Sequence, residues 1–183
     1  MTNRTTKTVY VTATTLDGFI ATDDHSLAWL LSRRLDDDSP WSHDRFMAGV
    51  GAIVMGRSTF DWVEDHRAAT GDAWFYDQPS WVMTTRELPV PDGADVRAAA
   101  GDVAEVHREL VAAAGGGDVW VVGGGGLATA LAQAGLLDEV VVSIAPVTLG
   151  AGKPLLDGHV ELELRDSGVN GEFLCARYAV VRT

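Results

Sequence analysis

Residues 119–131 read VWVVGGGGLATAL, an apolar segment that passes through four glycines into a stretch of helix-forming residues. The apolar half predicts a buried strand and the second half predicts a helix. Because glycine has no side chain, backbone N–H groups in such a turn can approach a ligand closely, and the following helix N-terminus adds partial positive charge. The stretch therefore predicts an anion site suited to a cofactor pyrophosphate. A tight strand-to-helix turn that contacts no ligand is the alternative.

Composition narrows the class of protein. A chain of 183 residues with 46% apolar content is long enough for one globular domain, which we expect to span residues 1–183. The net charge of −12 argues against nucleic acid or an anionic membrane as a partner, because both require clustered Lys and Arg. Cys175 is the single cysteine, and no apolar run approaches the roughly 18 residues of a membrane-spanning helix. We expect a cytoplasmic protein.

Strand and helix patterns alternate along most of the chain. Strands are predicted at residues 8–14, 52–55, 80–84, 119–122 and 140–145, and helices at 27–35, 42–50, from 58 onward and at 103–114. Near the C-terminus, residues 161–164 alternate, Asn170-Gly171 is a strong hairpin turn, and residues 173–181 return as a strand. This order predicts an α/β protein with a mixed central sheet, helices on its faces and a C-terminal antiparallel hairpin.

The glycine loop formally satisfies the dinucleotide pattern as Gly123-x-Gly125-x-x-Ala128. A Rossmann unit also places an acidic residue about 20 positions later, at the end of the next strand. Here Asp138 and Glu139 precede the next strand instead of ending it. The loop also comes late in the chain. A Rossmann-type dehydrogenase is therefore the weaker alternative.

Four further segments accompany the glycine loop in a fixed order. They are TATTLDGFIA at 12–21, VMGRSTF at 54–60, VMTTR at 82–86, and LDEVVVSIAP at 137–146 followed by Gly150 and Gly152. Together the five segments resemble the dihydrofolate reductase superfamily, and more closely its branch similar to the C-terminal reductase domain of bacterial riboflavin biosynthesis. The resemblance implies a three-layer fold, NADPH as cofactor, and hydride transfer to a small flat heterocycle such as a pterin, pyrimidine or flavin-like compound. It also implies a cis peptide bond between Gly123 and Gly124.

The resemblance assigns cofactor contacts within these segments. The segment from Gly56 to Thr59 joins a strand to a helix, so its amides, the Thr59 hydroxyl and the Arg57 guanidinium can bind phosphates. In the family, the region of Arg86 faces the adenosine 2′-phosphate, and two arginines favour NADPH over NADH. Ala13 and Ile20 match positions beside the nicotinamide, with plain core packing as the alternative. The expected cofactor-binding residues are Ala13, Ile20, Gly56, Arg57, Ser58, Thr59, Thr84, Thr85, Arg86, Gly123, Gly124, Gly125, Gly126, Leu127 and Thr129.

The sequence departs from the family pattern at the catalytic acid. Dihydrofolate reductases carry an acid four residues before an aromatic residue, but here Phe46 has Ser42 at that spacing. Asp44 lies nearby on the same predicted helix, Asp17 matches the mobile active-site loop, and Ser143 matches a hydroxyl near the substrate. These three are the catalytic candidates. A non-catalytic binding module of the same fold is the alternative function.

Two further expectations concern metals and assembly. None of the five histidines has metal-ligand spacing with Cys175 or another histidine, so we expect no metal site. The apolar run Trp74-Phe75-Tyr76 lies in an otherwise polar loop, which predicts either a hydrophobic plug or the interface of a homodimer.

Overall fold

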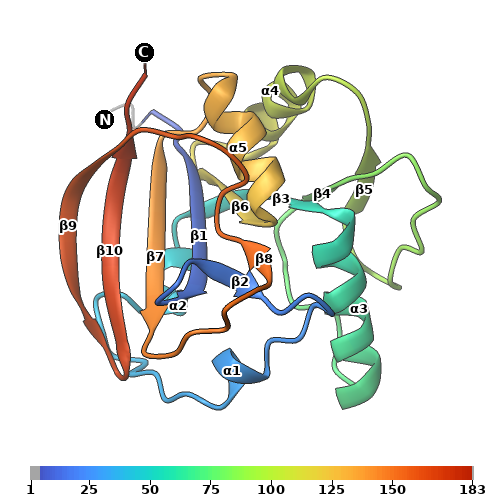
Figure 1. Ribbon diagram of the computed structural model, residues 1–183. Helices are drawn as coiled ribbons and strands as arrows, with labels where there is room; N and C mark the ends of the chain where they lie inside the picture. The colour runs from blue at the N-terminus through green and yellow to red at the C-terminus, as the bar shows by residue number, and fades with distance from the viewer. Residues whose placement is uncertain (1–4, 183) are drawn as a thin grey trace.

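The computed structural model describes residues 5–182. The strands are β1 (Thr8–Thr15), β2 (Phe19–Ala21), β3 (Val50–Gly56), β4 (Ser80–Met83), β5 (Val96–Ala99), β6 (Asp118–Gly123), β7 (Glu139–Ala145), β8 (Lys153–Pro154), β9 (Leu162–Asn170) and β10 (Phe173–Val180). Eight of them form one sheet in the order β5-β4-β3-β6-β1-β7-β10-β9, with β9 and β5 at its two edges (Figure 1). The six strands from β5 to β7 pair in parallel, whereas β10 pairs antiparallel with β7 and β9. Strands β2 and β8 form a separate pair.

Helices cover both faces of this sheet. They are α1 (Ala28–Leu31), α2 (His43–Met47), α3 (Arg57–Thr70), α4 (Val103–Ala113) and α5 (Gly125–Gln133). Neighbouring residues of one strand point to opposite faces. On β3, Val54 packs in the cluster that holds Leu110 of α4 and Leu131 of α5, whereas Ile53 packs in the cluster that holds Phe60 of α3. The result is the predicted three-layer α/β fold with a mixed sheet and a C-terminal antiparallel hairpin.

The predicted strands and hairpin are confirmed, but two helices are shorter than predicted. The pattern at residues 27–35 yields only α1, and the pattern at 42–50 yields only α2. Neither helix has a side-chain cap, and Val50 instead begins β3 beside Asp118. Strand β5 was not predicted, because two of its four side chains are exposed and its sequence shows little alternation.

The apolar run at residues 74–76 folds back as a plug. Trp74 and Tyr76 pack against the cluster of Phe60 and Trp120, while Phe75 remains 44% exposed. The plug interpretation is thus confirmed for two of the three aromatic residues. The homodimer stays a prediction.

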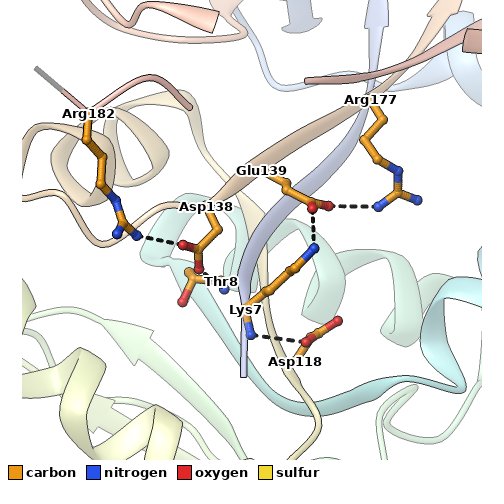
Figure 2. Close-up of polar contacts among 7 residues, drawn as sticks. All are labelled: Lys7, Thr8, Asp118, Asp138, Glu139, Arg177 and Arg182. Carbon is orange, nitrogen blue, oxygen red and sulfur yellow. Dashed lines mark hydrogen bonds and ion pairs between the residues drawn. The ribbon is translucent and has the colours of Figure 1, made fainter. Parts of the chain in front are cut away.

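Charged side chains gather where β1, β6 and β7 begin (Figure 2). The backbone N–H of Lys7 donates to Asp118 at 3.1 Å, and that of Thr8 donates to Asp138 at 2.8 Å. Glu139 accepts from Lys7 Nζ at 2.5 Å. Side chains from neighbouring strands therefore hold the start of β1 in register within the sheet.

Glu139 also accepts a hydrogen bond from Arg177 Nη1 at 2.8 Å. Burial alone would raise the pKa of Glu139, but the hydrogen bonds from Lys7 and Arg177 outweigh it and hold the pKa below its ordinary value. Because the pKa is depressed in the folded state, ionised Glu139 stabilises the fold above its ordinary pKa. That stabilisation is lost as the pH falls through the folded-state value.

Replacing Glu139 with Gln should lower the free energy of unfolding by about 1 kcal/mol at pH 7, since its partners are partly exposed. The difference between Glu139→Gln and the unmodified protein should shrink as the pH falls below about 4. Urea unfolding across this range measures it. Glu163→Gln, which removes an exposed pair with Arg165, is the control and should show a smaller effect. A Glu139→Gln effect that does not vary with pH would contradict the pKa assignment.

Two neighbouring glycines of α5 make a second stability test. A Cβ on buried Gly125 would lie 2.4 Å from the Pro154 carbonyl oxygen, whereas a Cβ on exposed Gly126 would meet only Asp157, at 4.0 Å. Gly125→Ala should therefore destabilise the fold by about 1–3 kcal/mol. Gly126→Ala should be neutral or stabilise it by up to about 1 kcal/mol, through lower backbone entropy in the unfolded chain. Thermal unfolding of both variants measures this, and equal effects would show that α5 does not pack closely on β8.

Candidate functional site

A cleft of about 770 Å³ opens where the parallel strands end. Gly56 of β3, Gly123 of β6, Ala13 of β1 and Ser143 of β7 all line it. Strands β3 and β6 are neighbours, and the chain leaves them in opposite directions across the sheet: β3 continues to β4, while β6 continues to β7 beyond β1. Open α/β sheets bind their ligands at such a switch point, outside the carboxyl ends of the strands.

Two helix N-termini begin at this cleft. Gly56 is the N-cap of α3 and Gly124 is the N-cap of α5, and neither helix has a side-chain hydrogen bond at its cap. Helix α4 differs, because Asp102 caps it by accepting from the Ala104 N–H. The first amides of a helix need acceptors and carry partial positive charge, so the uncapped ends of α3 and α5 suit a bound anion.

The two glycine turns contact each other directly. A Cβ on Gly56 would lie 3.7 Å from the Gly123 carbonyl oxygen, and a Cβ on Gly123 would lie 3.2 Å from Thr59 Oγ1. Across the turn, a Cβ on Gly124 would lie 3.9 Å from Ile20 Cδ1. The peptide bond between Gly123 and Gly124 is cis, as the family resemblance implies. Backbone rather than side chain therefore forms this part of the cleft wall.

Arg57 and Arg86 meet at a single carboxylate. Arg57 Nε donates to Asp61 Oδ1 at 2.6 Å, and Arg57 Nη1 donates to the Glu87 carbonyl oxygen at 2.7 Å. Arg86 Nη2 lies 3.5 Å from Asp61 Oδ2. The fold thus brings together two cations that are 29 positions apart in the sequence, at the N-terminal turn of α3.

The cleft contains most of the residues predicted to bind a cofactor. The lining includes Ala13, Ile20, Gly56, Arg57, Ser58, Thr59, Gly123, Gly124, Gly125, Gly126 and Leu127. Thr84, Thr85, Arg86 and Thr129 lie outside it. Thr129 is buried and its hydroxyl accepts from the Asp157 N–H at 2.9 Å, because its position in the second turn of α5 faces the chain after β8. Thr84 accepts from the Arg86 N–H, which shapes the loop that presents Arg86.

Neither predicted acid lines the cleft. Asp17 accepts from the Thr15 hydroxyl and from the N–H groups of Leu149 and Gly150, and these hydrogen bonds lower its pKa. A carboxylate with a lowered pKa is a poor proton donor near neutral pH, so Asp17 serves to tie its turn to the chain after β7. Asp44 is exposed on α2 and faces a shallow hollow beside Phe75. The third catalytic candidate, Ser143, does line the cleft, with its Oγ 3.6 Å from Cys175 Sγ.

His43 is the titratable group that sequence reasoning missed. It lies at the first position of α2, lines the cleft, and its ring packs edge-on against Trp120 with centroids 5.2 Å apart. Desolvation lowers the pKa of His43, and the charge of Asp44 opposes this shift. No sequence motif marks His43. The one available signal is that it follows Ser42, which stands where dihydrofolate reductases carry their acid.

Aromatic and cationic side chains line the cleft. Aromatic side chains from several elements form its walls, namely Trp41, Phe46, Trp62, Tyr76, Trp120 and Phe173. Four cations line it, Arg45, Arg57, Lys153 and Arg177, whereas Asp157 is the one carboxylate among its described lining residues. In a chain of net charge −12 this local excess of cations suits an anionic ligand, and the aromatic walls suit a flat ring.

Within residues 5–182 no group of three or more His, Cys, Asp or Glu side chains is arranged to hold a metal ion. The helices of that same range are also too short or too polar for any of them to cross a membrane.

Comparison with known proteins identifies the family. The uncharacterized protein YwjB of Bacillus subtilis is 28% identical over 178 residues, which cover 94% of this chain and 97% of YwjB. The crystal structure of a putative riboflavin biosynthesis protein from Shewanella sp. PV-4 superposes with a TM-score of 0.79 at 27% identity, covering 96% of this chain and 99% of that one. Dihydrofolate reductase from Enterococcus faecalis shares the fold, with a TM-score of 0.60 at 18% identity over 95% of this chain and 96% of its own. The family model of the RibD C-terminal domain matches residues 6–172, so the chain belongs to this family.

Proposed function

We propose that this protein is an NADPH-dependent reductase that transfers a hydride to a small flat heterocycle, such as a pterin, pyrimidine or flavin-like compound. The observation that carries the proposal is the pair of uncapped helix N-termini that open on one cleft beside Arg57. Two relatives support it by name. One is the putative riboflavin biosynthesis protein, and the other is a dihydrofolate reductase whose structure is a complex with NADP(H).

The residues of the cleft fit a dinucleotide phosphate cofactor. The amides at the start of α5 would hold its pyrophosphate, and Arg57 with Arg86 would hold the 2′-phosphate. Ala13 and Ile20 would flank the nicotinamide, since Ile20 lies next to Gly124. When bound, the cofactor supplies the hydride. The protein itself holds the two rings face to face and excludes water with its aromatic walls.

Hydride addition to a C=N or C=C bond must be completed by a proton. His43 is our candidate donor, in its protonated form, because it lines the cleft and neither Asp17 nor Asp44 does. Since its pKa is lowered, the protonated form is favoured at lower pH. The absence of both predicted acids from the cleft lining favours the second candidate function, a binding module that keeps the cofactor cleft without catalysis. NADPH oxidation in the presence of candidate heterocycles separates the two. Titration with NADPH and NADH, followed by tryptophan fluorescence, tests cofactor binding for both functions, since Trp41, Trp62 and Trp120 line the cleft.

Replacing both Arg57 and Arg86 with Ala should weaken the binding of NADPH at least tenfold, because one charge-assisted hydrogen bond to phosphate contributes roughly 1.5 kcal/mol or more. The affinity for NADH, which lacks the 2′-phosphate, should change less than about twofold by the same reasoning. The double variant Arg108→Ala with Arg165→Ala removes two exposed cations elsewhere and controls for net charge. Equal losses for NADPH and NADH would show that Arg57 and Arg86 do not bind the 2′-phosphate.

Replacing Gly124 with Val should abolish binding of both cofactors while the protein stays folded. The extended backbone at Gly124 accepts a side chain, and its Cβ would make only an ordinary contact with Ile20. The added branches would occupy the space beside the first amides of α5. Fluorescence titration measures binding and circular dichroism checks folding. A folded variant with normal affinity would show that this turn is purely structural.

A further inference from the structure

Asp61 occupies the position between Arg57 and Arg86. Its Oδ1 accepts from Arg57 Nε at 2.6 Å, and its Oδ2 lies 3.5 Å from Arg86 Nη2. One carboxylate therefore presents a separate oxygen to each of two guanidinium groups from different elements. A phosphate monoester offers the same pair of acceptor oxygens with more negative charge, so the two arginines that hold Asp61 are also able to hold a phosphate.

The two arginines differ in how firmly they are held. The Arg57 side chain is 19% exposed, and the Glu87 carbonyl oxygen fixes its guanidinium on a second side. Arg86 is 66% exposed, and its contact with Asp61 is the longer one. An exposed ion pair of this kind contributes little to stability. Arg86 can therefore turn from Asp61 toward a ligand at low cost, while Arg57 stays in place at the cleft.

We propose that Asp61 is an internal counterion that limits how strongly the cleft prefers a phosphorylated adenosine cofactor. This inference rests on the proposed NADPH function. When no ligand is bound, Asp61 holds the guanidinium groups of Arg57 and Arg86 close together. This arrangement slightly favours binding of a phosphate. With a 2′-phosphate between the arginines, the carboxylate remains a close like charge for as long as the complex lasts.

The repulsion outweighs the positioning effect. The positioning effect is small because the Arg86 contact is long and exposed, whereas Asp61, itself only 41% exposed, faces a phosphate of about two negative charges at short range. Asp61 therefore lowers the affinity for ligands that carry the 2′-phosphate and leaves other ligands unaffected.

The test measures binding of NADPH, NADH, 2′,5′-ADP and 5′-AMP to the full chain by tryptophan fluorescence or calorimetry. Asp61→Asn keeps the shape and one acceptor oxygen but removes the charge. This substitution should raise the affinity for NADPH and 2′,5′-ADP by about fivefold. It should change the affinity for NADH and 5′-AMP by less than about twofold. The control is Asp65→Asn, one turn later on α3, where an exposed carboxylate of equal charge is removed.

Several results would overturn the inference. Weaker NADPH binding by Asp61→Asn would make Asp61 a positioning residue, and equal tightening by Asp65→Asn would reduce the effect to general electrostatics. Failure of the unmodified protein to bind either dinucleotide contradicts the proposed function. The inference about Asp61 still stands in that case if Asp61→Asn tightens 2′,5′-ADP, and it fails if 2′,5′-ADP binds neither protein.

Discussion

The parallel pairing of β3 with β6 is the constraint on which the cleft depends. It sets Gly56 beside Gly123, where an added Cβ on Gly56 would lie 3.7 Å from the Gly123 carbonyl oxygen, an ordinary contact distance. The same pairing brings the N-termini of α3 and α5 to one place. Two partial positive charges then face the same cavity, which neither helix alone would provide.

Charge is divided unequally between the cleft and the rest of the molecule. The chain carries 26 acidic and 14 basic residues, yet four cations and one carboxylate are among the described residues that line the cleft. The negative surface keeps the protein away from polyanions, while the local cations attract small anions. Because Asp61 contacts Arg57 at the border of this region, we expect it to affect ligand binding more than an acid elsewhere on the surface does.

The fold and the glycine turns that line the cleft could be predicted from the sequence, since both depend on local patterns. Buried strands such as Val119–Val122 are continuous apolar runs, and glycine turns precede helices, so the order of elements is readable. Side-chain contacts between distant elements are not readable in this way. No local pattern shows that Asp61 joins Arg57 to Arg86, that Thr129 turns toward Asp157, or that His43 packs on Trp120.

The amino ends of the parallel strands contribute to stability, whereas their carboxyl ends form the cleft. At their amino ends, Asp118, Asp138 and Glu139 accept hydrogen bonds from Lys7 and Thr8, and these contacts hold the start of β1 in register. At their carboxyl ends β3 and β6 stop at Gly56 and Gly123, which leaves the first amides of α3 and α5 and the Arg57 guanidinium beside the cleft. Arg177 links the two regions, because it lines the cleft while Glu139 holds its guanidinium. Substitutions at the amino ends should therefore mainly affect the stability of the fold. They should affect ligand binding in the cleft mainly through the position of Arg177.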